Sequence, residues 1–273
     1  MSARLTPDSH RARLLDELAA RATVATSDAD LGGWWCKSDA DLPFRRSNTA
    51  LPPIGVGEDA EACRAAVADV VAWYRARGRR AIIQVSQADP QVALLDAVLE
   101  DLGLQREAPI EVWIAECAEV SARAAGAPGC SVSTIRGVDE GWCSTYGKLR
   151  GGDPSAEQRT QAYGRMLDRL GGRVVGATAR DQDGTIGVGF GVVEGDWVGV
   201  FGMATDPARR RQGVASGVVA ALVEAGTPLG ATWAYLQVEV DNAPALALYA
   251  GLGFVPSHAS HYRVTAPDGA QGC

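Results

Sequence analysis

Apolar positions recur along the chain in two alternating patterns, and together they predict helices and strands that follow one another. Apolar side chains spaced three and four residues apart predict helices, whereas short runs rich in Val, Ile, Trp and Tyr predict strands. In the first half, one predicted helix ends near residue 23, and two more cover 58–77 and 90–101. The predicted strands of this half cover 33–37, 44–51, 81–86 and 110–115.

The second half continues the alternation. Its predicted strands cover 131–136, 173–180, 185–194, 197–205, 232–240 and about 261–265, and its predicted helices lie within 138–170 and at 213–225 and 243–250. This order predicts an α/β (α+β) fold in which each half forms a mixed sheet flanked by helices.

The segment from Ala115 to Ser131 separates the two halves. It has no long apolar stripe and it collects Gly126, Pro128 and Gly129, which is typical of a linker or surface connection. A chain of 273 residues is also long enough for two lobes. We therefore predict two domains, 1–125 and 126–273. Residues 82–105 align with 235–255 once a gap is allowed, either through an old duplication or because strand, helix and glycine turn recur.

The charge and composition of the chain limit the classes of molecule that it is expected to bind. Acidic residues exceed basic ones, giving a net charge of −7 and a pI near 5.1, which disfavours nucleic acid and anionic membranes and suits an amine. The polar amino terminus does not resemble a signal peptide, and no apolar run is long enough to span a membrane. Six scattered cysteines and three histidines form no metal-binding pattern. We expect a soluble cytoplasmic protein with reduced thiols and no metal; the sequence indicates no oligomeric state.

The stretch "VGVFGMATDPARRRQGVASGVVAALVEA" (198–225) is the most informative. A predicted strand runs into a short turn, an arginine cluster (209–211), and then Gly213 at the start of an Ala/Val-rich helix. Glycine lets the backbone approach an anion closely, and the unpaired amides at a helix start attract negative charge. The arginines can add charge-assisted donors. This arrangement favours a pyrophosphate site.

A second segment, "LQVEVDNAPALALYAGLGF" (236–254), follows the next predicted strand. Asn242 and Tyr249 are seven residues apart, about two helical turns, so we expect both side chains on one side of a helix. Two plainer explanations stand beside a functional one. Asn242 can simply cap the helix, with Pro244 in its first turn, and Tyr249 can fill the core.

Together the two segments resemble the GNAT superfamily of acetyl-CoA-dependent N-acetyltransferases, over about residues 131–264. The resemblance rests on Arg210-x-x-Gly213-x-Ala215 and on the later Asn…Tyr…Gly-Phe order. It implies two GNAT-like lobes with mostly antiparallel sheets, acetyl-CoA as co-substrate, and Tyr249 as the acid that protonates the departing thiolate. The implied cofactor-binding residues are Met203, Ala204, Thr205, Arg210, Arg211, Gln212, Gly213, Val214, Ala215, Ser216 and Asn242.

The general base is not indicated, because the strand before the arginine cluster lacks the Glu that the superfamily often has there. Glu194, Asp196 and Glu239 are candidates, and a water relay is the alternative. His258 and His261 can line the acceptor pocket as an acid/base pair or lie exposed on an edge strand.

The first half lacks the Arg-x-x-Gly-x-Ala motif. Its helix at 58–77 begins with carboxylates at 58, 59 and 61, which would repel a pyrophosphate. The segment 32–52, with Trp34, Arg45, Arg46 and Asn48, is similar to one in the degenerate first domain of some bacterial tandem GNAT proteins. We expect this half to be structural and to hold no cofactor.

The sequence thus predicts an N-acetyltransferase that acts on an amine, with a small molecule favoured by the acidic pI. A protein N-acetyltransferase and a catalytically idle acyl-CoA sensor or interaction module are the alternatives. A nucleotide-binding Rossmann unit is disfavoured because no Gly-x-Gly-x-x-Gly follows a strand.

Overall fold

Contacts between residues divide the chain into two compact units. A computed structural model describes residues 7–42, 44–56, 59–124, 126–149 and 156–266. Unit 1 comprises Met1–Ala20, Ala25–Val112 and Ser257–Cys273, and unit 2 comprises Arg21–Val24 and Trp113–Pro256. The expected domain boundary between residues 125 and 126 stays a prediction. The sequence analysis did not predict that the carboxyl-terminal strand groups with unit 1.

Unit 1 is a mixed sheet with helices packed on it. Its strands run in the order β1-β2-β3-β4-β11-β5. In chain order its elements are α1 (Pro7–Arg21), β1 (Ser27–Leu31), β2 (Trp34–Ser38), η1 (Arg45–Ser47), β3 (Ala50–Leu51), α2 (Ala60–Arg75), β4 (Ile82–Ser86), α3 (Val92–Asp101), β5 (Gln105–Glu116, up to Val112) and β11 (Val255–Val264, from Ser257). β3 and β4 are parallel, whereas β11 and β4 are antiparallel.

The core of unit 1 lies between its sheet and α2 and α3. Cys63, Val67, Val70 and Tyr74 of α2 are buried, and this spacing of four, three and four residues places them on one helix face. Leu95, Val98 and Leu99 of α3 join them against β4. The predicted helix boundaries were therefore close, because this apolar spacing marks them.

Two parts of unit 1 differ from the sequence predictions. The strand expected at 44–51 is wrong except for Ala50–Leu51. The buried Asn48 amide donates to the carbonyls of Leu42 and Phe44, and its Oδ1 accepts from Asp39 N, which holds this segment as a loop with one helical turn. The polar strand β1 was not predicted because Ser27–Leu31 lacks apolar alternation.

Unit 2 has the strand order β5-β10-β9-β8-β7-β6. Its elements are the end of β5 (from Trp113), α4 (Cys117–Arg123), β6 (Ser131–Arg136), α5 (Glu140–Leu149), α6 (Ala156–Leu170), η3 (Gly171–Arg173), β7 (Val174–Asp181), β8 (Gly184–Glu194), β9 (Trp197–Thr205), η4 (Pro207–Arg209), α7 (Val214–Gly226), η5 (Thr227–Leu229), β10 (Trp233–Glu239) and α8 (Ala243–Gly251). β6 to β9 pair antiparallel, and β9 and β10 pair parallel.

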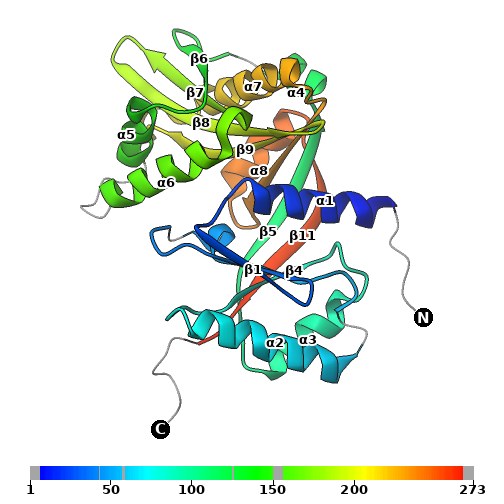
Figure 1. Cartoon of the computed structure of the whole chain (residues 1–273). Helices are drawn as coiled ribbons and strands as arrows, with labels where there is room; N and C mark the ends of the chain where they lie inside the picture. Colours follow the sequence, from blue (N-terminus) through cyan, green and yellow to red (C-terminus); the bar gives the residue numbers. More distant parts are fainter. Residues whose placement is uncertain (1–6, 43, 57–58, 125, 150–155, 267–273) are drawn as a thin grey trace. The chain divides into compact units, whose positions relative to one another are not determined.

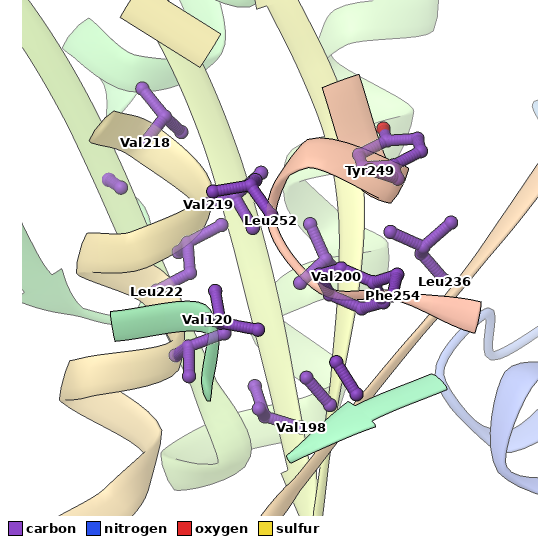
Figure 2. Close-up of a cluster of buried hydrophobic side chains, with 14 of the residues drawn as sticks. Val120, Val198, Val200, Val218, Val219, Leu222, Leu236, Tyr249, Leu252 and Phe254 are labelled. Atoms are coloured by element: carbon purple, nitrogen blue, oxygen red, sulfur yellow. The ribbon is translucent and has the colours of Figure 1, made fainter. Parts of the chain in front are cut away.

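The helices of unit 2 cover both faces of its sheet (Figure 1). A Cβ added at Gly189 of β8 would meet Val218 and Leu222 of α7. The next residue, Phe190, contacts the rings of Trp142 in α5 and Tyr163 in α6. Because successive residues of a strand point to opposite faces, α7 packs on one face and α5 and α6 on the other. Figure 2 shows the α7 face of this core, in which Val218, Val219 and Leu222 of α7 and Val198 and Val200 of β9 belong to one buried cluster.

The remaining global predictions concern thiols and membranes. Cys36, Cys63, Cys117, Cys130 and Cys143 are free thiols, as the sequence analysis expected; Cys273 and Glu58 lie outside the described residues. No helix within the described ranges is long and apolar enough to cross a bilayer. Within the same ranges no group of three His, Cys, Asp or Glu residues is placed to hold a metal ion.

Candidate active site

The strands β9 and β10 pair over a short length and then stop pairing. Trp197, Val198 and Gly199 pair with Trp233, Ala234 and Tyr235, and the register includes no later residue of either strand. The backbone of β9 from Val200 to Thr205 therefore has hydrogen-bonding groups on its β10 side that this ladder does not use. An extended ligand can pair with such a strand edge.

A bulge interrupts β9 in this same stretch. Phe201 pairs with Phe190 and Ala204 with Val188, so β9 contains one extra residue between these pairs. Gly202 lies there with a φ of 59°, a backbone conformation that residues with a side chain rarely adopt. A Cβ at Gly202 would lie 2.7 Å from the Phe190 ring and 3.1 Å from the Tyr163 hydroxyl. The bulge changes the direction of the backbone just before Met203, Ala204 and Thr205.

The loop after β9 is held by carboxylates. Asp206 accepts a hydrogen bond from Ala208 N at 2.8 Å. Arg209 forms ion pairs with Asp181, the last residue of β7, at 2.8 Å and with Asp183, in the turn before β8, at 2.5 Å. The Arg209 hydrogen bond keeps the pKa of the Asp181 carboxyl below its usual value. Arg209 is therefore a structural clamp. Arg210 and Arg211 are exposed, and neither has a carboxylate partner within the described residues.

The helix α7 begins beside the end of β9. Gly187 pairs with Thr205, and the Val214 side chain packs directly over Gly187. Gly213 is the N-cap residue of α7, with a φ of 85°, and it provides no side-chain cap. The first amides of a helix have no partner inside the helix. The amides of Val214, Ala215 and Ser216 are thus available to an anion. That they bind a pyrophosphate stays a prediction.

The corresponding helix of unit 1 is capped differently. α2 also follows a strand of a parallel pair, β3, but its N-cap is Asp59. The Asp59 carboxylate accepts from Glu61 N at 2.8 Å and from Ala62 N at 3.1 Å. A negative side chain thus occupies the amides that a phosphate would need.

The second predicted pair, Asn242 and Tyr249, lies at the two ends of α8. Asn242 is exposed and caps the helix, its Oδ1 accepting from Ala245 N at 3.2 Å. Tyr249 is buried and packs edge-on against Phe254 at 5.9 Å. Both plainer explanations of these residues are therefore correct as structural descriptions. Whether they also serve the cofactor stays a prediction.

The Tyr249 hydroxyl is the polar end of an otherwise apolar cluster. Figure 2 shows its oxygen pointing away from Leu252 and Phe254. Among the described residues the hydroxyl has no hydrogen-bond partner. Burial raises the pKa of Tyr249 to about 12, so the hydroxyl keeps its proton at neutral pH.

The three carboxylate candidates for a general base lie in different places. Glu194 is engaged by Arg21 at 2.6 Å and Arg173 at 2.7 Å. Glu194 ends β8 and Asp196 lies in the turn before β9. Both are about 20 Å along the strand from Met203 at 3.3 Å per residue. Glu239, at the end of β10, is exposed and lies beyond Tyr235, where the pairing of β10 with β9 ends.

The histidine hypothesis is wrong in both of its forms. β11 is an inner strand, between β4 and β5, so neither residue lies on an edge. His258 contacts Asp16 at 3.3 Å and His261 contacts Asp96 at 2.9 Å, all within unit 1. Three residues apart on a strand, the two rings point to opposite faces and cannot act as a pair.

An aromatic cluster near the bulge was missed. The rings of Trp142 and Tyr146 are stacked at 5.4 Å, and those of Tyr146 and Tyr163 at 5.0 Å. The Trp142 indole donates to the carbonyls of Ala177 and Gly189. Trp142 and Tyr146 are four residues apart on a helix, a spacing that indicates a shared face, but only the fold brings them to Gly202.

The family of the chain follows from a match over nearly its whole length. Residues 10–263 match the family model described as "Probable histone acetyltransferase Rv0428c C-terminal". The chain belongs to this Rv0428c C-terminal family. Its resemblance to N-acetyltransferases is thereby confirmed.

Individual relatives agree with the family. The "Uncharacterized N-acetyltransferase YobR" of Bacillus subtilis is 21% identical over 252 residues, which cover 92% of this chain and 98% of YobR. A "Mycothiol acetyltransferase" of Clavibacter michiganensis is 40% identical over 77 residues, covering 28% of this chain and 25% of that protein.

Solved structures confirm the predicted fold. A GCN5-related N-acetyltransferase from Kribbella flavida has a TM-score of 0.73 at 15% identity, with 98% of each chain covered. A "Tandem GNAT protein from the clavulanic acid biosynthesis pathway" has a TM-score of 0.69 at 15% identity, covering 94% of this chain and 89% of that one. The chain therefore has a GNAT fold. Together with the family match, this makes it an acetyltransferase of GNAT type.

Proposed function

We propose that this chain transfers an acetyl group from acetyl-CoA to the amine of a small molecule. The observation that carries the proposal is the end of β9, where a strand edge not used by β10 lies beside an α7 start that Gly213 leaves without a side chain. The edge can pair with the extended arm of the cofactor, and the α7 amides can bind its pyrophosphate.

The pyrophosphate end involves the residues predicted from the motif. The amides of Val214, Ala215 and Ser216 donate to phosphate oxygens, and Gly213 lets the chain approach closely. Arg210, Arg211 and Gln212 are exposed at the same loop and add side-chain donors. Asn242 contributes through the start of α8, where it fixes the first turn that leads to Tyr249.

The reacting end lies at the bulge of β9. The acceptor nitrogen attacks the thioester carbonyl, a C–N bond forms, and the C–S bond then breaks. Backbone amides of Met203, Ala204 and Thr205, turned by the bulge at Gly202, stabilise the negative oxygen that develops on the carbonyl. The acceptor approaches from the face of α5 and α6, where Tyr163 lies beside the bulge and stacks on Tyr146.

Two proton transfers complete the reaction. Tyr249 gives its proton to the departing thiolate and recovers one from solvent. Burial raises the pKa of Tyr249 to about 12, so the phenol still carries its proton when the C–S bond breaks. The acceptor's proton leaves through water toward Glu239, the exposed candidate carboxylate at the end of β10.

The deciding experiment measures free thiol release from acetyl-CoA with a panel of acceptors. The panel contains amino acids, polyamines, amino sugars and lysine-bearing histone peptides, since the family description names histones. Release with small amines supports the proposal, and release with peptides alone supports the protein N-acetyltransferase. Binding of CoA with no release for any acceptor would favour the idle sensor. Tyr249→Phe serves as the catalytic control, and compartment and oligomeric state lie outside this test.

A further inference from the structure

Unit 1 has its own pair of parallel strands that stop pairing. β3 and β4 share one register pair, Ala50 with Ile83. Beyond it lies a cavity of about 20 Å³, lined on one side by the last residue of β3 and residues 52–54, and on the other by residues of β4 and the turn that follows. We call it the Asp16 pocket; its lining residues are Arg13, Asp16, Leu51, Pro52, Pro53, Ile54, Gln84, Ser86, Ala88, Asp89 and Leu95.

Asp16, on α1, is the buried acid of this pocket. Its side chain is 1% exposed. Asp16 Oδ1 accepts from Gln84 Nε2 at 2.7 Å and lies 3.3 Å from His258 Nε2. Asp16 Oδ2 has no hydrogen-bond partner among the described residues. Buried carboxylate oxygens without a partner are costly, so an unpaired Oδ2 points to a ligand that donates a hydrogen bond.

A second unpaired oxygen faces the same way. Ser260 of β11 pairs directly with Ser86 of β4, so their side chains share a sheet face. Gln84, two residues before Ser86, lies on that face and contacts Asp16. Ser260 Oγ is buried without a partner within the described residues. Two acceptor oxygens, one of them on a carboxylate, therefore lie on the side of the sheet that contacts α1.

The charges around the pocket favour a cation. Asp16 and Asp89 contribute two carboxylates. Asp89 is partly satisfied by the amides of Gly55 at 3.0 Å and Gln91 at 2.8 Å. The one lining cation among the described residues, Arg13, is matched by Glu17 at 2.8 Å and the Pro52 carbonyl at 2.9 Å.

We propose that the Asp16 pocket binds a cationic nitrogen, as free ammonium or as the ammonium end of a small primary amine. A cavity of this size accommodates a group about as large as a water molecule. Unlike a metal ion of the same charge, an ammonium group donates hydrogen bonds, which is what Asp16 Oδ2 can accept. The proposal concerns unit 1 alone and is independent of acetyl transfer.

The test is thermal unfolding of the full chain in ammonium chloride or methylammonium chloride, against sodium and potassium chloride at equal ionic strength. A ligand that binds only the folded state raises Tm. We expect Tm to rise by about 2–4 °C more in an ammonium salt than in the metal salts. The stronger of the two ammonium salts identifies free ammonium or an amine as the preferred ligand.

Matched variants separate the pocket from general salt effects. Asp16→Asn should lose the extra shift, whereas Asp69→Asn, at an exposed carboxylate of α2 in the same unit, should keep it. If Asp16→Asn does not fold, Asp89→Asn, which removes the charge of the other lining carboxylate, should still weaken the response about fivefold in ligand concentration. Equal shifts in potassium chloride, or a full shift in a folded Asp16→Asn, would mean that the pocket holds only water and would overturn the proposal.

Discussion

Asp59 and Gly213 occupy the same position, the N-cap, of α2 and α7, and they leave the first helical turn in opposite states. The Asp59 carboxylate binds the amides of Glu61 and Ala62. Gly213 has no side chain and leaves the amides of α7 to another acceptor. One residue thus separates a helix start that is closed to anions from one that is open to them.

The first prediction is that CoA binds at Gly213. Gly213→Glu should abolish CoA binding in calorimetry, because the new carboxylate would take the place of the pyrophosphate and repel it. Gly213→Gln is the matched control, since it places the same strain on a residue with a φ of 85° and adds no charge. It should retain weakened binding. Equal affinities for wild type and Gly213→Glu would show that the loop assignment is wrong.

The same calorimetry gives the stoichiometry. Since Asp59 closes the start of α2, we expect one CoA per chain. Asp59→Ala should lower the free energy of unfolding by about 1 kcal/mol through loss of the cap. A stoichiometry of two CoA in the wild type would contradict a structural role for unit 1.

The helix starts were the most predictable part of the site. Gly213 and Asn242 are identified by residue type and position, because capping is a local property of the chain. The course of β11 was not predictable in the same way. The buried His258 and His261 depend on β11 pairing with β4, a contact between segments far apart in the sequence. No local pattern reports such a pairing.

Lys37 gives a prediction about pH. It is buried in unit 1, and its Nζ donates to the Ala20 carbonyl at 2.7 Å. Burial lowers the pKa of Lys37 to about 7, well below its ordinary value of 10.5. Between these two values the unfolded chain binds a proton that the folded chain does not, so stability rises as pH rises. From pH 7 to 8.5 wild type should gain about 1–2 kcal/mol relative to Lys37→Met.

Urea unfolding of both proteins at several pH values between 7 and 8.5 measures this difference. Lys148→Met is the control, because Lys148 is exposed on α5. It should follow the wild-type pH dependence. If Lys37→Met also follows wild type, Lys37 keeps its charge in the folded state and the burial argument fails.

A third prediction concerns the bulge of β9. Gly202→Ala places a methyl group 2.7 Å from the Phe190 ring and 3.1 Å from the Tyr163 hydroxyl. We expect a stability loss of about 1–3 kcal/mol from overpacking and a fall in turnover of at least tenfold as the amides of Met203–Thr205 shift. The readouts are Tm and kcat with the best amine.

Gly171→Ala is the control that separates the effect of backbone strain from the effect of the contacts made by the added methyl group. Gly171 has a φ of 56°, close to that of Gly202, but nothing lies within 4 Å of its added Cβ. This variant should lose stability through backbone strain alone and keep full turnover. Normal turnover in Gly202→Ala would remove the bulge from the mechanism.

The bulge also shows where sequence reasoning ended. "WVGVFGMAT" predicts a strand, and β9 has the predicted bounds. Which glycine takes a positive φ, and that Tyr163 from α6 lies beside it, depends on how β8 and β9 pair and on helix packing. The position of Tyr163 follows from tertiary contacts that its local sequence does not specify.

The last prediction concerns Tyr249. Tyr249→Phe keeps the ring that packs against Phe254 and removes only the hydroxyl, which has no partner among the described residues. Folding and CoA affinity should therefore change little. Turnover should fall by about a hundredfold or more, the typical contribution of a positioned acid. The measurement compares kcat, CoA affinity and Tm for the two proteins.

Tyr74→Phe is the control that makes the Tyr249 result specific. Tyr74 is also buried, but its hydroxyl donates to the Lys37 carbonyl at 2.9 Å in unit 1. Its loss should cost about 1 kcal/mol of stability and leave kcat unchanged. Tyr249→Phe should thus lower turnover without changing stability, and Tyr74→Phe should lower stability without changing turnover. A stable Tyr249→Phe with wild-type kcat would leave Tyr249 as a packing residue, because solvent would then be protonating the thiolate.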